Sequence, residues 1–416
     1  MSKNPFNFSK PVKGKDFCNR KEEIKKAIGF IKNLQCFSVV GERRIGKTSL
    51  LEHLLSQEVL KEHGIDIRKH TIIWLNVGSL HEPTEDAFIR AMLERLREHT
   101  QAKRESGSVR QRFVSYVENL VSDNRNLVIA LDEFEIVEPI LDEYFPHWFR
   151  SVLQKPNIMA ITSSQITIGE IGPDGMASPL FNIFGNLFLG LFVREETEKM
   201  FSEFFLRGKE ELNTEEISFL ADLSGGNPYL IQLLGYHYYE ERTKNKEVHK
   251  NEFEDRMLDH LRDQFEGYWK HLSEEERELL LKIENSSNDQ ISRTLERKGF
   301  VIKKGENWGI FSPLFERFIE TKIPKNDFRS RQMRKKTPED KKSLKKEPRK
   351  RVLKSRSILG ALLIGIIANL VAICIQKFYP EILKRVPLRI DLLSLIISIV
   401  SLVIALIALT KLSSKR

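Results

Sequence analysis

The chain has 416 residues, of which 41% are hydrophobic and 30% charged, and this composition excludes a wholly disordered protein. Its formal net charge of +9 is unevenly spread: residues 321–356 carry 16 Lys or Arg against 4 Asp or Glu, whereas residues 1–320 are mildly acidic. A basic segment beside apolar runs favours contact with a membrane surface over a basic DNA-binding face. The three cysteines are scattered, which excludes a disulfide framework and a C-x-x-C zinc site.

Short apolar runs alternate with helical patterns in residues 14–192. The runs are rich in Ile and Val and predict strands buried on both faces, at residues 36–40, 71–75, 127–131 and 158–163. Helical periodicity predicts helices between them, at residues 48–60, 84–97 and 109–121. Strands that alternate with helices predict an α/β domain with a parallel sheet flanked by helices.

A phosphate-binding pattern follows the first predicted strand. Residues 41–48 read GERRIGKT, which fits G-x-x-x-x-G-K-[ST] between a strand and a helix. The glycines let the loop turn its backbone N–H groups inward, and the following helix adds positive potential for phosphate. Lys47 is expected to bind the β- and γ-phosphates of ATP, and Thr48 to ligate Mg²⁺. The predicted nucleotide-binding residues of this P-loop are Gly41, Gly46, Lys47, Thr48 and Ser49.

A second motif supplies carboxylates for the same site. Residues 126–133 read NLVIALDE, an apolar strand that ends in two acids as in a Walker B motif. Asp132 is expected to complete the Mg²⁺ shell, and Glu133 to orient or deprotonate the attacking water as the catalytic residue. The alternative is that Glu133 is only a solvated loop acid, so that the protein binds nucleotide but hydrolyses it poorly.

Polar residues at the end of the fourth predicted strand face the same crevice. These residues are Thr162, Ser163, Ser164 and Gln165. Parallel strands bring their carboxyl ends to one edge of the sheet, so one of the four is placed to sense the γ-phosphate. Capping of the strand end is the equally weighted alternative.

The loop GERRIGKTSLL, residues 41–51, resembles the double-arginine P-loop of archaeal-type ATPases, which sit near the AAA+ and STAND signalling NTPases. Residues 17–23, FCNRKEE, resemble the F-x-G-R-x-x-E motif that flanks the adenine in these families, with Asn19 in place of glycine. The resemblance implies that Arg20 belongs to the nucleotide site. Arg43 and Arg44 are left open between phosphate or inter-subunit contacts and plain solvation.

Residues 223–229, LSGGNPY, resemble the G-G-x-P-Y lid motif of STAND-like ATPases, in which the proline lies near the bound base. This resemblance assigns Pro228 to the nucleotide site and residues 193–247 to a helical lid. From the residues alone, Gly-Gly-Asn-Pro is also a plain turn between two helices. Residues 248–320 are similar to the winged-helix module that follows the lid in these ATPases.

Two uncharged apolar runs, at residues 357–376 and 392–410, predict transmembrane helices at residues 357–376 and 390–410, each long enough to cross about 30 Å of hydrocarbon. The positive-inside rule places both ends of this hairpin, and with them the ATPase domain, on the cytoplasmic side. Residues 321–356 are too polar to bury a core and predict a flexible basic linker. Its 16 cations are expected to contact anionic lipid.

These features predict a membrane-anchored switch that binds and hydrolyses ATP with Mg²⁺ between core and lid, and that signals to a protein partner or a second copy of itself. Two alternatives stay open: a DNA-binding, initiator-like ATPase, and an effector whose hairpin perturbs the membrane. Nucleic acid is the weaker partner, because residues 251–320 carry 11 Lys or Arg against 16 Asp or Glu.

Overall fold

The computed structural model describes residues 3–82, 84–99, 106–171, 179–245, 247–283, 289–305 and 307–322, which all belong to one compact unit, Met1–Arg331. Within these ranges no helix is both long and apolar enough to cross a bilayer. The predicted transmembrane helices, and the basic linker beyond Lys322, lie outside the described residues and stay predictions.

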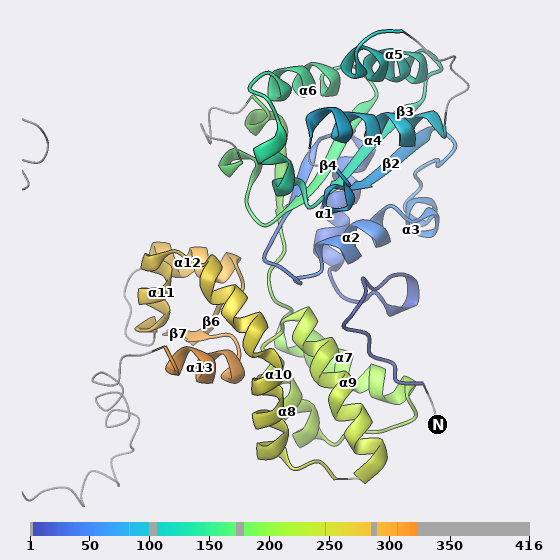
Figure 1. Ribbon diagram of the computed structural model, residues 1–416. Coiled ribbons are helices and arrows are strands. Elements are labelled where there is room, and N and C mark those ends of the chain that lie inside the picture. Colours follow the sequence, from blue (N-terminus) through green and yellow to red (C-terminus); the bar gives the residue numbers. More distant parts are fainter. Residues whose placement is uncertain are drawn as a thin grey trace, which may run out of the picture. The chain divides into compact units, whose positions relative to one another are not determined.

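A five-stranded parallel sheet forms the centre of the N-terminal part of the chain (Figure 1), with the strand order β2-β3-β4-β1-β5. Its strands are β1 (Phe37–Val40), β2 (His70–Asn76), β3 (Asn126–Asp132), β4 (Ile158–Ser164) and β5 (Gly185–Phe188). The first four confirm the predicted strands within two residues. The fifth was not predicted, because it has only four residues and two of them are exposed. The predicted α/β class with a parallel sheet is confirmed.

Helices cover both faces of this sheet. They are α1 (Lys21–Lys32), α2 (Lys47–Leu54), α3 (Gln57–Glu62), α4 (Glu85–Arg97), α5 (Val109–Ser122) and α6 (Phe145–Leu153). Right-handed crossovers place α2 on one face and the helices α4 to α6 on the other; in Figure 1, α5 and α6 lie above the strands and α1 and α2 below them. The single helix predicted at residues 48–60 is wrong, because Ser56 accepts a hydrogen bond from the Val59 N–H and starts a new helix, α3.

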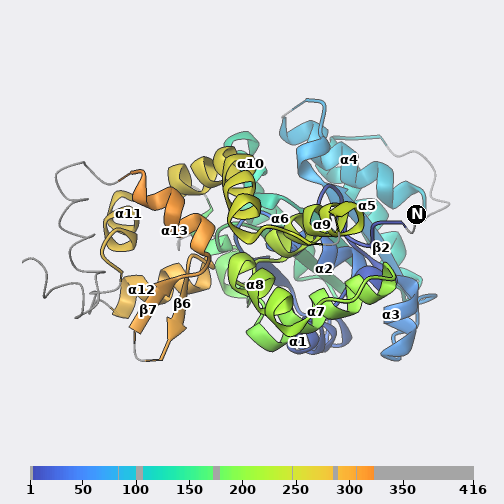
Figure 2. The ribbon, with the colours of Figure 1, turned by 90° about the horizontal axis from the view of Figure 1, so that it is seen from below.

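The chain continues into a helical region after β5. Helices α7 (Arg194–Arg207), α8 (Thr214–Ser224) and α9 (Pro228–Asn245) fall within residues 193–247. We call these three helices the lid, after the resemblance, and their role as a lid stays a prediction. A second group follows, with α10 (Lys250–His271), α11 (Glu274–Leu280), α12 (Asp289–Arg297), the antiparallel pair β6 (Val301–Lys304) and β7 (Asn307–Ile310), and α13 (Pro313–Glu320). Figure 2 shows α11 to α13 and the β6–β7 pair gathered in one group. That this group is a winged helix stays a prediction.

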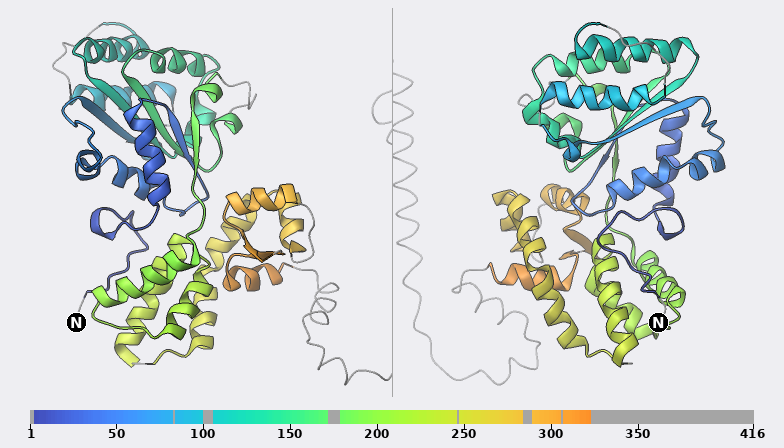
Figure 3. Two further views of the ribbon diagram at one scale, coloured as in Figure 1. Left: turned by 180° about the vertical axis from the view of Figure 1, so that it is seen from behind. Right: turned by 45° about the vertical axis from the view of Figure 1, so that its right-hand side comes forward.

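Buried apolar residues form two separate clusters. The first, which we call the core cluster, packs the sheet against its helices. The second, which we call the lid cluster, joins α7, α8 and α9 to α10 and α13, and it also includes Phe6 from the N-terminal end. In the two views of Figure 3 the N-terminal end accordingly lies beside the lid helices.

Candidate functional site

A cavity of about 900 Å³ lies where the P-loop, the lid and α10 meet. It is lined by most of the residues that the sequence predicts for the nucleotide site, namely Arg20, Gly46, Lys47, Thr48, Ser49, Asp132, Glu133 and Pro228. Gly41 is not part of the lining. A Cβ at Gly41 would lie 2.8 Å from Ile45 Cγ2 and 2.9 Å from the Leu189 carbonyl oxygen, so the loop needs a glycine there to pack on the strand ends.

Lys47 is held at the mouth of the P-loop by the loop itself. Its Nζ donates to the carbonyl oxygens of Gly41 at 2.8 Å and Glu42 at 3.1 Å. Burial lowers the pKa of Lys47, while the nearby carboxylates of Glu135 and Glu42 act in the opposite direction. The ammonium is therefore desolvated before any ligand arrives, and a phosphate would satisfy it better than two carbonyl groups do.

Thr48 and Asp132 meet directly, although 84 residues separate them in the sequence. Thr48 Oγ1 donates to Asp132 Oδ2 at 2.8 Å, and the Asp132 carboxylate is 1% exposed. The Ser163 hydroxyl, at the end of β4, donates to the other carboxylate oxygen, Asp132 Oδ1. Strand β4 lies between β1 and β3 in the sheet, so Ser163 forms the floor between the P-loop and the Walker B aspartate.

This donor set fits Mg²⁺. The ion prefers oxygen ligands and usually takes one or two carboxylates together with waters and substrate phosphates. A hydroxyl and a carboxylate that already face each other provide such oxygens, and Thr48 and Asp132 would hold the ion. In the part of the chain that the structure describes, no group of three or more His, Cys, Asp or Glu forms a metal site of its own. An Mg²⁺ ion held by Thr48 and Asp132 would take its remaining ligands from the nucleotide and from water.

Glu133 follows directly and adopts a left-handed backbone conformation with φ +57°. Its backbone N–H donates to Asp132 Oδ1 at 3.2 Å and to Ser163 Oγ at 3.3 Å, which fixes this turn. A Cβ on Gly78 would lie 2.4 Å from Glu133 Oε2, so the glycine after β2 makes room for the carboxylate. Glu133 lines the cavity and is only partly buried, which leaves it able to contact a water.

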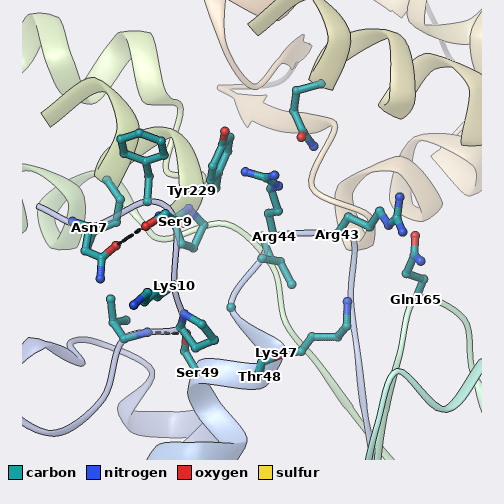
Figure 4. Close-up of a pocket in the computed structure, with 18 of the residues that line it drawn as sticks. Asn7, Ser9, Lys10, Arg43, Arg44, Lys47, Thr48, Ser49, Gln165 and Tyr229 are labelled. Atoms are coloured by element: carbon teal, nitrogen blue, oxygen red, sulfur yellow. Dashed lines mark hydrogen bonds between the residues drawn. The ribbon is translucent and has the colours of Figure 1, made fainter. Parts of the chain in front are cut away.

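Of the four polar residues at the end of β4, only Gln165 lines the cavity. Thr162 and Ser163 are fully buried, and the Ser164 hydroxyl donates to the Ile166 carbonyl group. Gln165 lines the cavity, and its Nε2 donates to Glu135 Oε1 at 3.0 Å. Figure 4 shows Gln165 and Arg43 pointing toward each other on this side of the pocket.

Arg20 connects the P-loop to the strand that leads into the lid. Its guanidinium donates to the carbonyl oxygens of Gly190 at 2.6 Å and Ile45 at 3.2 Å, and it lies 4.5 Å from the ring centroid of Phe192. It is 6% exposed, and burial lowers its pKa. Asn19, which replaces the usual glycine of this motif, has φ +63°, a conformation that asparagine tolerates better than most residues do.

The Gly-Gly-Asn-Pro turn packs against two other parts of the chain. A Cβ on Gly225 would lie 1.9 Å from the Phe311 carbonyl oxygen, and one on Gly226 would lie 2.2 Å from that of Phe192. The Phe192 N–H in turn donates to the Gly226 carbonyl oxygen at 2.8 Å. The turn is therefore the place where the lid contacts both the segment after β5, which we call the strand exit, and the second helical group. We call this turn the joint.

Tyr229, to which the sequence analysis gave no role, lines the cavity from the lid side. Tyr229, next to Pro228, stacks on Arg44 of the P-loop, with the guanidinium carbon 4.1 Å from the ring centroid. Figure 4 shows this pair spanning from loop to lid, so Arg44, although exposed to solvent, also contacts the lid. The tyrosine of the GGNPY pattern was the signal that pointed to this contact.

The N-terminal residues before the predicted core also reach the cavity, and the sequence prediction gave them no role. Residues 7–12 line it, and the Val12 N–H donates to Ser49 Oγ at 3.1 Å. The closely spaced Phe6 and Phe8 were the available signal, because two aromatic residues are unexpected in a solvated tail.

A comparison with protein families finds one match. The family model described as Novel STAND NTPase 2 matches residues 31–288, which is more than half of the chain. The matched range contains the P-loop, the Walker B strand and the Gly-Gly-Asn-Pro turn. No curated protein matches the chain.

Solved structures resemble the fold. A Walker-type ATPase of Pyrococcus abyssi is 16% identical, with a TM-score of 0.54 over 76% of this chain and 99% of that protein. The ORC1 protein of Aeropyrum pernix, solved in complex with DNA, is 12% identical, with a TM-score of 0.43 over 78% of this chain and 95% of that protein. The Cdc6p protein of Pyrobaculum aerophilum is 13% identical, with a TM-score of 0.44 over 76% and 98%. At 16% identity the first similarity shows a shared fold alone. We draw no conclusion from the other two, because their TM-scores are below 0.5.

Proposed function

The chain belongs to the novel STAND NTPase 2 family, and from this premise we propose that it is a membrane-anchored switch driven by ATP binding and hydrolysis. As a P-loop NTPase of this family it is an ATPase. The proposal concerns what that activity does: nucleotide and Mg²⁺ bound between the core and the lid favour one arrangement of the lid, and hydrolysis favours another.

One observation carries the proposal. The hydroxyl of Thr48 and the carboxylate of Asp132, which are hydrogen-bonded to each other and suited to Mg²⁺, line one cavity together with Lys47, Glu133 and residues of the lid, and this supports the proposal. When bound, Mg²⁺ neutralises charge on the phosphates. Lys47 exchanges its loop carbonyls for phosphate oxygens, and Glu133 accepts a proton from the water that attacks.

The lid side supplies the basis for a switch. Tyr229 and Arg44 link lid to P-loop, and Arg20 holds the P-loop and the strand exit together. A nucleotide biases two arrangements only through the difference in its affinity for them. A nucleotide that contacts Arg44 or moves the P-loop breaks these contacts between lid and P-loop. Its affinity therefore differs between the two arrangements of the lid.

The central test compares nucleotide binding and hydrolysis in three forms of the protein. Lys47→Ala is expected to lose binding because it removes the P-loop cation that we assign to the β- and γ-phosphates. Glu133→Gln is expected to keep binding and to lose turnover by about 10²- to 10⁴-fold, the usual contribution of a general base. The measurements are equilibrium titration with a fluorescent ATP analogue and phosphate release.

Matched controls lie on helix α3, where Glu58 and Lys61 are exposed and outside the cavity. Glu58→Gln and Lys61→Ala should hydrolyse ATP at the rate of the unmodified protein. Equal turnover in the unmodified protein and in both cavity variants would remove the assignment of the site.

Membrane attachment is the part of the proposal that rests on sequence alone. The two apolar runs at 357–376 and 390–410, with the basic linker before them, support an anchored protein that also contacts anionic lipid. We expect the full-length protein to float with liposomes and to resist extraction by high salt. A protein truncated after residue 331 should remain in solution, and flotation of that truncated form would contradict an anchor in the hairpin.

A further inference from the structure

Residues 3–13, which we call the strap, precede the predicted core, yet they are attached at one end to the lid. Phe6 is 3% exposed, and its ring centroid lies 5.2 Å from that of Phe205 and 5.3 Å from that of Phe204, both on α7. A Cβ on Gly235 of α9 would lie 2.3 Å from the Phe6 ring. The lid therefore contains a socket that this phenylalanine fills.

Polar contacts fix the same end of the strap. Asn4 Nδ2 donates to the Tyr236 carbonyl oxygen at 3.1 Å, and the Asn7 N–H donates to Gln232 Oε1 at 2.8 Å. Both partners lie on α9, the helix that begins at the Gly-Gly-Asn-Pro turn. The anchor thus combines apolar contacts with hydrogen bonds, and the hydrogen bonds join residues more than 200 positions apart in the sequence.

The other end of the strap is attached to the nucleotide-binding loop. The Val12 N–H donates to Ser49 Oγ at 3.1 Å, and Ser49 lies on α2 next to the metal-binding Thr48. Figure 4 shows the strap passing Asn7, Ser9 and Lys10 along the pocket before this bond. Because residues 7–12 all line the cavity, the strap crosses the nucleotide site from the lid to the P-loop helix.

We propose that the strap is a tether that limits how far the lid moves from the P-loop helix and so positions the lid over the nucleotide. The six residue-to-residue steps from Phe6 to Val12 can span at most about 20 Å when extended. The chain bends at residues 8–10, so the tether has slack, but only up to that limit. This inference rests on the proposed nucleotide site.

The tether acts on retention of the nucleotide and not on the chemical step. Lys47, Asp132 and Glu133 all belong to the core, so their geometry does not depend on the strap. Phe6 and Val12 are positioning residues that act through the lid and through Ser49. A longer tether lets the lid open further, and the nucleotide then leaves faster.

The experiment lengthens the tether without removing either anchor. Four Gly and Ser residues inserted between Lys10 and Pro11 of the full-length protein add about 13 Å of reach. Release of a fluorescent ADP analogue is expected to accelerate about twofold, because the effective concentration of the lid at the site falls roughly as the −3/2 power of the length of the tether. Single-turnover hydrolysis of prebound ATP should be unchanged, because no group that reacts has moved.

A readout that needs no nucleotide accompanies these rates. The Phe192 N–H donates to the Gly226 carbonyl oxygen at the lid joint, so hydrogen exchange at this amide reports opening of the lid. Exchange at Phe192 should be faster in the lengthened protein. If the unmodified protein bound no nucleotide, the proposed function would fail, while this exchange measurement would still decide the tether.

The matched control is the same insertion after Arg68, in an exposed turn of the core. It should change neither release nor exchange at Phe192. Phe6→Ala should accelerate both, and combining it with the lengthened strap should add nothing, because both changes act through one attachment. Unchanged release and unchanged Phe192 exchange in the lengthened protein would overturn the tether, even if Phe6→Ala destabilised the lid.

Discussion

The core cluster and the lid cluster assemble their residues in different ways. In the core, the groups that act on phosphate come from two short motifs at the ends of β1 and β3, and one parallel sheet holds them. In the lid cluster, distant segments meet: Phe6 packs against Phe205, and the Ser312 hydroxyl donates to the Leu223 carbonyl oxygen at 2.7 Å. The residues of the core site are therefore held by neighbouring strands of one sheet, whereas the packing of the lid helices depends on contacts between distant segments.

Because the two clusters are built differently, we expect substitutions in them to have different effects. Changes at strand ends in the core should affect the reaction and leave the lid in place. Changes at the joint should loosen the lid and leave the reacting groups intact. The next two predictions test whether effects on the lid and effects on the nucleotide site can be separated in this way.

The largest effect on stability is expected at the joint. Gly225→Ala places a methyl group 1.9 Å from the Phe311 carbonyl oxygen at a residue with φ +55°. Overpacking together with a left-handed alanine should lower the free energy of unfolding of the lid cluster by about 2–4 kcal/mol. Denaturant titrations that follow lid and core separately measure this loss.

Gly29→Ala in α1 is the matched control, because nothing lies within 4 Å of the added Cβ. This helical position should instead gain about 0.5–1 kcal/mol. If the two substitutions changed stability equally, the close approach at the Gly-Gly turn would not constrain the lid.

A smaller effect is expected at Arg20, which belongs to the core but holds the exit to the lid. Arg20→Met leaves the carbonyl groups of Gly190 and Ile45 without this donor, at a cost of about 1–3 kcal/mol in unfolding free energy. Nucleotide affinity should also fall, by about tenfold if 1.4 kcal/mol of that loss appears in binding. Thermal unfolding and nucleotide titration measure the two effects.

Arg68→Met controls for the loss of a guanidinium. Arg68 is 87% exposed and pairs with Asp66 in a surface turn, so neither stability nor affinity should change. An Arg20→Met protein with normal nucleotide affinity would show that the link between P-loop and lid exit does not contribute to binding.

The sequence was sufficient for the parts of the site that local patterns encode. The P-loop and the Walker B strand each lie in one short run, and parallel strands bring such ends together, which explains why Thr48 and Asp132 could be paired in advance. The short strand β5 was missed because its exposed residues show no buried apolar run. The break between α2 and α3 was missed because a single capping serine outweighed the helical period.

Contacts across the lid were beyond sequence reasoning for a different reason. No pattern within a few residues of Phe6 indicates a socket on α7 and α9, and no spacing rule pairs Arg44 with Tyr229. The role of Arg20 was inferred by resemblance. Its two carbonyl partners could not be, because the fold alone brings Gly190, just after β5, close to Ile45 of the P-loop. Such contacts are set by the folded topology and not by the period of any one element.

The position of β4 has one more consequence. Because β4 separates β1 from β3, the two motifs stand two strand spacings apart, about 10 Å. Thr48 and Asp132 span that width with their side chains, and Ser163 lies beneath them with its hydroxyl on Asp132. We therefore expect evolution to accept only small side chains at position 163, since a bulkier one would displace Asp132 from Thr48.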